Sequence, residues 1–244
     1  MSSISDFIRK AHHSFCTAVV VAAGDSTRMG RDKLMISIGA VPVLARTLLA
    51  LNGSAAIDEI IVVTQQEKLN AVSEMKAEYG IDKLKKIVIG GKNRTESALA
   101  GVSEADKRAK IICIHDAVRP FVSDQIIQDA VHYAVLYQSA APAVPVKDTI
   151  KVAVDGVVTE TPDRSRLFAV QTPQAFQVDI IKAALSAAVT GRHNYTDDCA
   201  AVEALGVRSY LCRGSEDNIK ITTPADLIAA EAILKKMETT GNEQ

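Results

Sequence analysis

The chain has 244 residues, of which 48% are hydrophobic, enough to bury the core of one large α/β domain or two small ones. Its 28 basic and 29 acidic residues give a formal net charge of -1, so it lacks the basic excess that is typical of nucleic-acid-binding proteins. Its four cysteines form no CxxC pair, which argues against a zinc ribbon or a disulfide framework. Without an apolar run that spans a bilayer or a signal-like apolar core near residue 1, we expect a cytoplasmic protein.

Short apolar runs rich in β-branched residues alternate with amphipathic stretches through the first 146 residues. The runs predict strands at 17–22, 59–64, 86–89, 110–115 and 140–146. The stretches between them predict helices at 41–51, 66–78, 95–104 and 123–137. Because the strands are continuously apolar, we expect burial on both faces. This predicts an α/β fold with an open, mostly parallel Rossmann-like sheet and helices on both faces.

The pattern changes after Val146, where two short strand-like runs flank the dipeptide Asp155-Gly156. An Asp-Gly pair between such runs predicts a β-hairpin. An isolated hairpin is marginally stable in water, so we expect the arm at about 147–166 to pack on a second copy of the chain and to form a homodimer. Helices at 178–189, 197–205 and 224–235 and a strand at 208–212 complete the pattern. We expect one domain at 16–236, with residues 1–15 as an N-terminal extension and 237–244 as a tail.

The loop after the first strand is the best local candidate for a triphosphate site. Ala22, Ala23 and Gly24 allow the backbone to approach a ligand closely, and Arg28 and Lys33 follow in the same loop. The loop matches neither a Walker A nor a GxGxxG motif. An ordinary glycine turn with surface cations is the alternative interpretation.

Three further polar segments follow strands, and carboxyl ends of parallel strands share one edge of a sheet. In the first, Gly91 and Ser97 flank Arg94 at the start of a helix, where ligand anions bind well. In the second, Asp116 precedes Arg119 by three positions, a pattern that suits a metal ion and a phosphate but also a buried ion pair.

The third segment contains Asp217 and Lys220, which have no evident structural role in the sequence. Arg164, Thr172 and Thr196 add polar groups elsewhere. His115 is more consistent with a packed strand-end residue than with a base. Because the cations outnumber any nucleophiles, the set favours direct nucleotidyl transfer, in which catalysis is positioning and charge neutralisation.

In their order along the chain these motifs resemble the 2-C-methyl-D-erythritol 4-phosphate cytidylyltransferases of the non-mevalonate isoprenoid pathway, within the glycosyltransferase-A-like nucleotidyltransferases. The resemblance runs from about Thr17 to Leu234 and includes GGxxRxxS, HDAVRP, TPQ and DNIKIT. It implies transfer of CMP from CTP to methylerythritol 4-phosphate, with Mg²⁺ as cofactor and release of pyrophosphate.

The resemblance also implies roles for individual residues. Arg28, Lys33 and Lys220 would be catalytic. CTP would bind at Ala22, Ala23, Gly24, Gly91, Arg94, Ser97, Asp116 and Ala117. The sugar phosphate would bind at Arg119, Thr172 and Thr196 and at Thr149 and Arg164 from the neighbouring subunit's arm. Asp116 and Asp217 are the candidate metal ligands, although the triphosphate itself can hold most of the Mg²⁺.

The sequence departs from the family's frequent residues at 32–35, at Lys92, where an acidic residue is common, and at Asp198, where Glu is common. A ribitol-5-phosphate cytidylyltransferase is the nearest alternative, and the Ala22-Ala23-Gly24 opening favours the erythritol enzyme. A sugar-phosphate thymidylyltransferase or a molybdopterin nucleotidyltransferase is a more distant alternative. An inactive regulatory nucleotide-binding module is a third class of interpretation, against which the retained cations argue.

Overall fold

The computed structural model describes residues 14–24 and 32–241. The predicted Arg28 lies outside these residues. The elements are β1 (Cys16–Val21), β2 (Ser37–Ile38), β3 (Val41–Pro42), α2 (Val43–Gly53), β4 (Glu59–Thr64), η1 (Gln66–Lys68), α3 (Leu69–Glu78), β5 (Leu84–Ile89), α4 (Arg94–Ser103), β6 (Ile111–Asp116), α5 (Asp124–Tyr137), β7 (Ser139–Pro145), β8 (Val152–Val154), β9 (Val157–Glu160), η2 (Arg164–Arg166), β10 (Phe168–Val170), β11 (Gln174–Gln177), α6 (Val178–Thr190), α7 (Asp198–Glu203), β12 (Tyr210–Arg213) and α8 (Pro224–Gly241).

The central sheet has eight strands in the order β10-β7-β11-β6-β1-β4-β5, and β12 pairs with β7. β1 is parallel to β4 and β6, β4 is parallel to β5, and β12 is parallel to β7. β10 and β11 are the antiparallel members. The mostly parallel α/β sheet predicted from the sequence is therefore confirmed, whereas these two short strands were not predicted.

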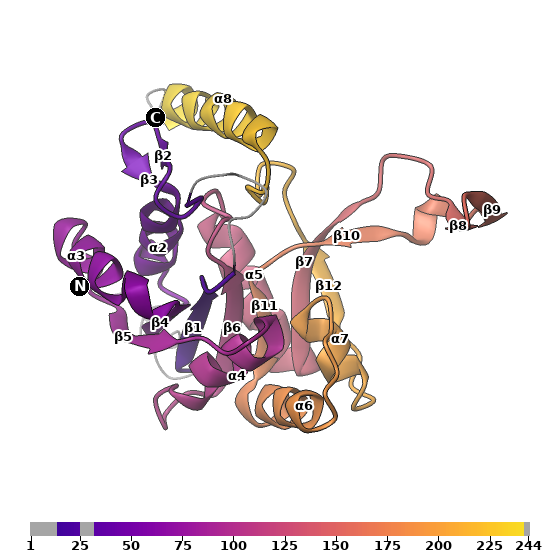
Figure 1. Cartoon of the computed structure of the whole chain (residues 1–244), viewed down its shortest axis with the longest axis horizontal. Coiled ribbons are helices and arrows are strands. Elements are labelled where there is room, and N and C mark those ends of the chain that lie inside the picture. The colour runs from indigo at the N-terminus through magenta and orange to yellow at the C-terminus, as the bar shows by residue number, and fades with distance from the viewer. Residues whose placement is uncertain (1–13, 25–31, 242–244) are drawn as a thin grey trace, which may run out of the picture.

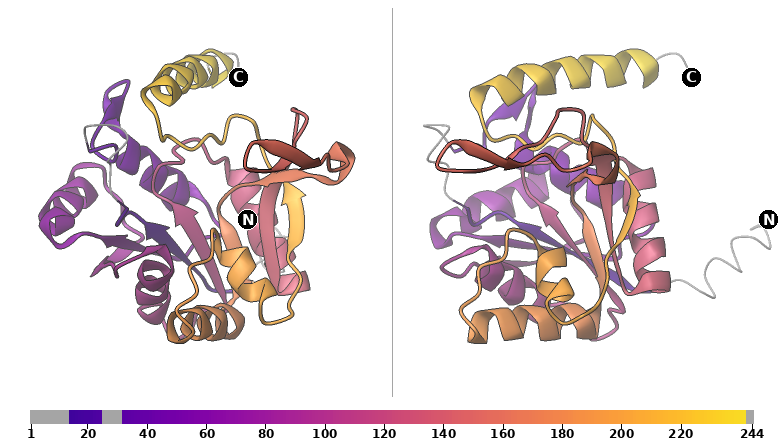
Figure 2. Two further views of the ribbon diagram at one scale, coloured as in Figure 1. Left: turned by 45° about the vertical axis from the view of Figure 1, so that its right-hand side comes forward. Right: turned by 90° about the vertical axis from the view of Figure 1, so that its right-hand side faces the viewer.

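Side chains from β1 alternate between two buried layers, which explains its continuous apolar run. Cys16, Ala18 and Val20 pack into the core that includes residues of α2 and α5, while Val19 packs into the core with residues of α4 and α6. Helices consequently cover both faces of the sheet (Figures 1 and 2). None of the helices formed by the described residues is long and apolar enough to cross a membrane.

Local side chains cap the starts of α5 and α7. Ser123 caps α5 by accepting a hydrogen bond from the N–H of Ile126. Asp197 caps α7, because its carboxylate accepts from the N–H of Ala200.

The hairpin of β8 and β9 projects from the body of the molecule (Figure 1). Asp155 and Gly156 both have positive φ, 52° and 81°, which is the backbone of the two-residue hairpin turn predicted from the Asp-Gly pair. Every residue of β8 and β9 is exposed, including Val154 at 61% and Val157 at 68%. The arm thus presents apolar side chains that the single chain leaves uncovered.

Candidate active site

A pocket of about 230 Å³ lies at the carboxyl ends of the parallel strands, where ligands bind in open α/β sheets. It is lined by the loop after β1, the start of α4, the loop after β6 and Lys220 from the segment after β12. Ten of the predicted site residues line it: Ala22, Ala23, Gly24, Lys33, Gly91, Arg94, Ser97, Asp116, Ala117 and Lys220. Residues from four separate segments therefore meet as the sequence predicted.

Glycines bring two walls of the pocket together. A Cβ on Gly90 would lie 2.6 Å from the Cβ of Ala23 and 2.8 Å from Oγ of Ser97. A Cβ on Gly91 would lie 2.3 Å from the Cβ of Glu96. A side chain on Gly90 would push the β1 loop and α4 apart, and one on Gly91 would collide with the first turn of α4, so both positions require glycine.

The start of α4 is held rigidly by its own side chains. Asn93 caps the helix by accepting from the N–H of Glu96, and Glu96 in turn accepts from the N–H of Lys92. The hydroxyl of Ser97 donates to the carbonyl of Asn93 and accepts from the N–H of Gly91, at 2.8 and 3.1 Å. This wall is consequently preorganised before any ligand arrives.

Asp116 is the electrostatic centre of the pocket. Its Oδ2 lies 2.8 Å from Nζ of Lys220 and 3.6 Å from Nε of Arg119, and its Oδ1 lies 3.7 Å from Nη2 of Arg94. Burial raises the pKa of this carboxyl group, but the cations, Lys220 first, outweigh burial and hold the pKa at about 2. Asp116 is thus ionised at any physiological pH.

Arg94 is shared between two carboxylates. Nη2 donates to Oδ2 of Asp198 at 2.7 Å, and Asp198 is almost fully buried. Burial alone lowers the pKa of Arg94, but the pairs with Asp198 and then Asp116 raise it above its ordinary value. The guanidinium is therefore a fixed positive charge, and Asp198 is the residue that holds it.

Asp198 had only a weak signal in the sequence, as a departure from the frequent Glu. It is placed by Gln174, whose Oε1 accepts from the N–H groups of Asp198 and Cys199 at 2.9 and 3.0 Å. Nε2 of Gln174 also donates to Oδ2 of Asp197. The start of α7 is thereby tied to β11, a strand that the sequence pattern did not predict.

His115 is buried and neutral, in agreement with its interpretation as a packed residue. Burial lowers its pKa to about 4. Nδ1 of its ring lies 3.0 Å from the hydroxyl of Thr172, and Nε2 lies 3.2 Å from the carbonyl of Arg119. Thr172 is itself 5% exposed and lies behind the pocket, not among the residues that line it.

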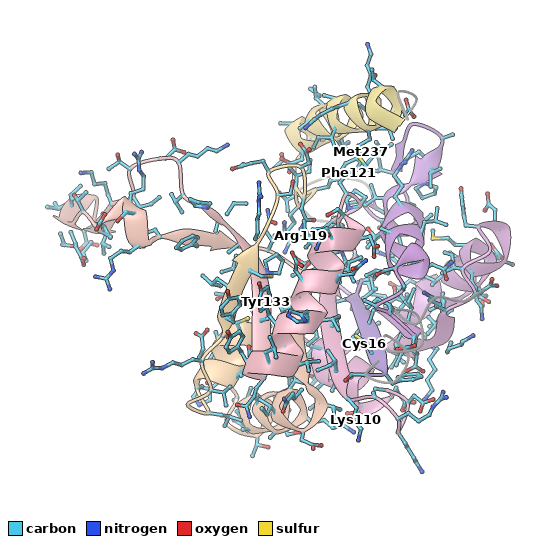
Figure 3. All side chains as sticks on the ribbon, turned by 180° about the vertical axis from the view of Figure 1, so that it is seen from behind. Cys16, Lys110, Arg119, Phe121, Tyr133 and Met237 are labelled. Carbon is cyan, nitrogen blue, oxygen red and sulfur yellow. The ribbon has the colours of Figure 1, made fainter. Side chains whose placement is uncertain are left out.

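Five other predicted residues do not line the pocket: Arg119, Thr149, Arg164, Thr196 and Asp217. Arg119 is close, since it faces Asp116 from behind. In Figure 3 it lies at the same end of the sheet as Phe121, with Lys110 at the opposite end. Arg164 donates to the carbonyl of Lys147 within the arm.

Asp217 has a structural partner that the sequence did not reveal. Its Oδ2 lies 2.8 Å from Nζ of Lys236 on α8, so its carboxylate joins the segment after β12 to the last helix. Among the described residues no group of three or more His, Cys, Asp or Glu side chains is placed to hold a metal ion. Asp116 is the one carboxylate among the described residues that line the pocket. One carboxylate fits a Mg²⁺ ion that takes its other ligands from substrate phosphates.

Comparisons with known proteins agree with this geometry. The family model of 2-C-methyl-D-erythritol 4-phosphate cytidylyltransferase matches residues 16–236. A protein of that name from Clostridium novyi (strain NT) is 44% identical over 226 residues, which cover 91% of this chain and 97% of the relative. One from Caldanaerobacter subterraneus subsp. tengcongensis is 45% identical over 224 residues, covering 90% and 99%.

A solved structure gives the same result for the fold. The 4-diphosphocytidyl-2C-methyl-D-erythritol synthase of Anaerococcus prevotii superposes with a TM-score of 0.82 at 29% identity and covers 91% of this chain and 97% of its own. The likeness extends over nearly the whole of both chains.

Proposed function

The chain belongs to the 2-C-methyl-D-erythritol 4-phosphate cytidylyltransferase family, and from this premise we propose how its pocket carries out the reaction. It transfers CMP from CTP to 2-C-methyl-D-erythritol 4-phosphate, giving 4-diphosphocytidyl-2-C-methyl-D-erythritol and pyrophosphate, for isoprenoid precursor biosynthesis. The observation that supports this most is Asp116 with Lys220, Arg94 and Arg119 at the carboxyl edge of the sheet.

The nucleotide occupies the preorganised half of the pocket. Backbone groups of Ala22, Ala23 and Gly91, with Ser97, surround the cytosine, and Asp116 and Ala117 lie beside the ribose. Gly24 and Lys33 line the pocket together. The triphosphate passes over Gly24 toward Lys33.

Cations carry the chemical step. The 4-phosphate of the sugar alcohol attacks the α-phosphorus of CTP in line with the leaving pyrophosphate. Arg28 and Lys33 neutralise the β- and γ-phosphates, and Lys220 stabilises the charge that grows on the α-phosphate oxygens. Its side chain is 44% exposed, so Lys220 can turn from Asp116 toward the phosphate without leaving a buried space. No covalent enzyme intermediate is needed.

A Mg²⁺ ion would be held by Asp116 and the triphosphate oxygens, where it neutralises phosphate charge. Asp217 is less suitable as a ligand because it does not line the pocket and its carboxylate contacts Lys236 on α8. The arrangement fits an ion that arrives with CTP.

The sugar phosphate is held from two subunits. Arg119 and Thr196 contribute from the same chain, and Thr149 and Arg164 of the partner subunit contribute from its arm. The exposed valines of β8 and β9 support a homodimer, because a second copy would cover them.

We place the enzyme in the cytoplasm. Its four cysteines are free and buried, and the Sγ atoms of Cys16 and Cys113 lie 3.5 Å apart as thiols. Adjacent unlinked thiols are typical of a reducing compartment.

A pyrophosphate-release assay with CTP and Mg²⁺ tests the function. We expect release with 2-C-methyl-D-erythritol 4-phosphate and little with ribitol 5-phosphate. Faster release with ribitol 5-phosphate would reassign the substrate. No release with either acceptor, from a chain that binds CTP, would favour the inactive nucleotide-binding module.

A further inference from the structure

Four residues behind the pocket form a closed ring of hydrogen bonds. The hydroxyl of Thr172 pairs with Nδ1 of His115 at 3.0 Å, and Nε2 of His115 pairs with the carbonyl of Arg119 at 3.2 Å. Nη1 of Arg119 donates to the carbonyl of Asn218 at 2.7 Å. Nδ2 of Asn218 donates to the carbonyl of Thr172 at 3.0 Å and closes the ring.

The direction of every bond in the ring is determined by its chemistry. A carbonyl oxygen can only accept, so Nε2 of His115 carries the proton that it shares with Arg119. Nδ1 is then an acceptor in the neutral ring, and the hydroxyl of Thr172 donates to it. Each member therefore donates to the next: Thr172 to His115, His115 to Arg119, Arg119 to Asn218, and Asn218 to Thr172.

The ring joins three loops that the chain brings together from distant positions. His115 and Arg119 flank the end of β6, Thr172 precedes β11, and Asn218 follows β12. Two more bonds tie the same loops: the N–H of Asp116 donates to Oγ1 of Thr172 at 3.1 Å, and the N–H of Ile221 donates to the carbonyl of Val118 at 2.9 Å. Lys220 lies between Asn218 and Ile221, so its backbone is held on both sides.

We propose that His115 is a positioning residue for cytidylyl transfer. Through its ring with Thr172, Arg119 and Asn218 it fixes the place at which Lys220 meets Asp116. The expected effect on kcat rests on the proposed function, whereas the expected tautomer of His115 rests on the geometry of the ring alone.

The ring also changes the role of Thr172. Its hydroxyl donates to His115 and accepts from the N–H of Asp116, so both directions of bonding are used inside the protein. Its side chain is buried and does not line the pocket. Thr172 is therefore assigned to positioning Asp116 and not to binding the sugar phosphate, which was its role by family resemblance.

Paired substitutions at Thr172 separate the two roles. Thr172→Val keeps the shape of the side chain but removes the hydroxyl, and Thr172→Ser keeps the hydroxyl. For a positioning role we expect Thr172→Val to lower kcat by roughly 10- to 100-fold with little change in either KM, and Thr172→Ser to restore it. Thr64→Val is the matched control, because Thr64 is a buried threonine whose hydroxyl has no hydrogen-bond partner among the described residues.

Two amide substitutions, each of which replaces one nitrogen of the imidazole, test His115 in the same assay. Asn at this position keeps an acceptor near Nδ1, and Gln keeps a donor near Nε2, but neither bridges Thr172 and Arg119. We expect both His115→Asn and His115→Gln to lower kcat while KM changes little. An increase in the KM of the sugar phosphate alone in Thr172→Val, or unchanged kinetics in folded Thr172 and His115 variants, would overturn the proposal.

The tautomer of His115 in the unmodified protein gives a test that needs no activity and no variant. ¹⁵N NMR of the ring should show a neutral imidazole with its proton on Nε2 at pH 7.5. A proton on Nδ1, or an imidazolium, would break the ring and refute the proposal. If the wild-type protein releases no pyrophosphate but shows this tautomer, the proposed function fails while the ring stands.

Discussion

The charged residues Asp116, Arg94 and Asp198, here called the floor of the pocket, and the β-hairpin arm differ in how their side chains are held. At the floor, Asp116, Arg94 and Asp198 each bond to groups from distant parts of the chain and lie largely out of solvent. In the arm, every residue of β8 and β9 is exposed, and Arg164 donates to a backbone carbonyl of the arm itself. One chain therefore preorganises this part of the pocket by itself, whereas in the proposed homodimer the arm's side chains act on a second copy.

Substitutions of the pocket cations should give the largest effect. Lys33→Ala and Lys220→Ala should each lower kcat by about 10²-fold or more, because each removes a cation that stabilises charge in the transition state. Lys236→Ala is the matched control, since Lys236 pairs with Asp217 outside the pocket. Steady-state kinetics with a thermal melt checks this. A folded variant with near-normal kcat would remove that lysine from the mechanism.

Breaking the buried pair of Arg94 with Asp198 should lower the free energy of unfolding more than breaking an exposed pair of the arm. Asp198→Ala leaves the guanidinium of Arg94 without its nearest carboxylate, and we expect a loss of about 3 kcal/mol in the free energy of unfolding. Lys147→Ala, which removes the exposed pair of Lys147 with Glu216, should leave the unfolding curve unchanged. Urea titration measures both. Equal losses would erase the distinction between floor and arm.

Acid should destabilise the hydrogen-bonded ring behind the pocket. His115 has a folded-state pKa of about 4, below its ordinary value of about 6.5, so the unfolded chain takes up a proton first as the pH falls. Its contribution is complete above pH 6.5 and is lost between 6.5 and 4, by up to about 3 kcal/mol. Urea titrations of the ligand-free protein without metal should show this slope. The slope should shrink in folded His115→Asn, and an equal slope in that variant would exclude His115 as its source.

Substitution of the arm's cation should give the smallest effect and a selective one. If Arg164 binds the sugar phosphate as proposed, Arg164→Ala removes a charged hydrogen bond. The KM for the sugar phosphate should then rise by roughly tenfold, while the KM for CTP and the free energy of unfolding stay unchanged. Equal effects on the two substrates would argue against a role at the neighbouring site.

Mixing variants sharpens the same comparison. If Arg164 serves the partner's pocket, then dimers formed from Arg164→Ala and Lys220→Ala chains contain one intact site. With the sugar phosphate well below its KM, where each variant alone is weakly active, roughly one quarter of wild-type activity should return after subunit exchange. If the mixture shows no more activity than the two variants measured separately, Arg164 acts within its own chain.

Much of the pocket could be predicted because its residues follow strands. Ala22, Gly91, Asp116 and Lys220 each come after an apolar run or near one, and the carboxyl ends of parallel strands share an edge, so their meeting follows from local pattern. The Asp-Gly turn of the arm is equally local.

The residues that hold the pocket residues in place could not be predicted from the sequence, because the contacting residues are distant along the chain. Asp198 contacts Arg94 from 104 positions away, and Asn218 contacts Thr172 from 46 positions away. β11, which carries Gln174, is only four residues long and has a polar residue at each end, so no apolar period marks it. Asp217 was predicted as a possible metal ligand because no partner for it is visible in the sequence. Its contact with Lys236 depends on how α8 packs, which no local pattern shows.

The hairpin turn has a consequence for the order in which parts of the chain fold. Its strands are joined by two residues, so they can find each other within microseconds, early in folding. The central sheet forms later, because it needs contacts between distant positions, such as the hydrogen bond of Ser139 with Ser209, which are 70 positions apart. For the proposed homodimer we therefore expect the pairing of two subunits to be limited by the rate at which each sheet is completed, not by the rate at which the arm forms.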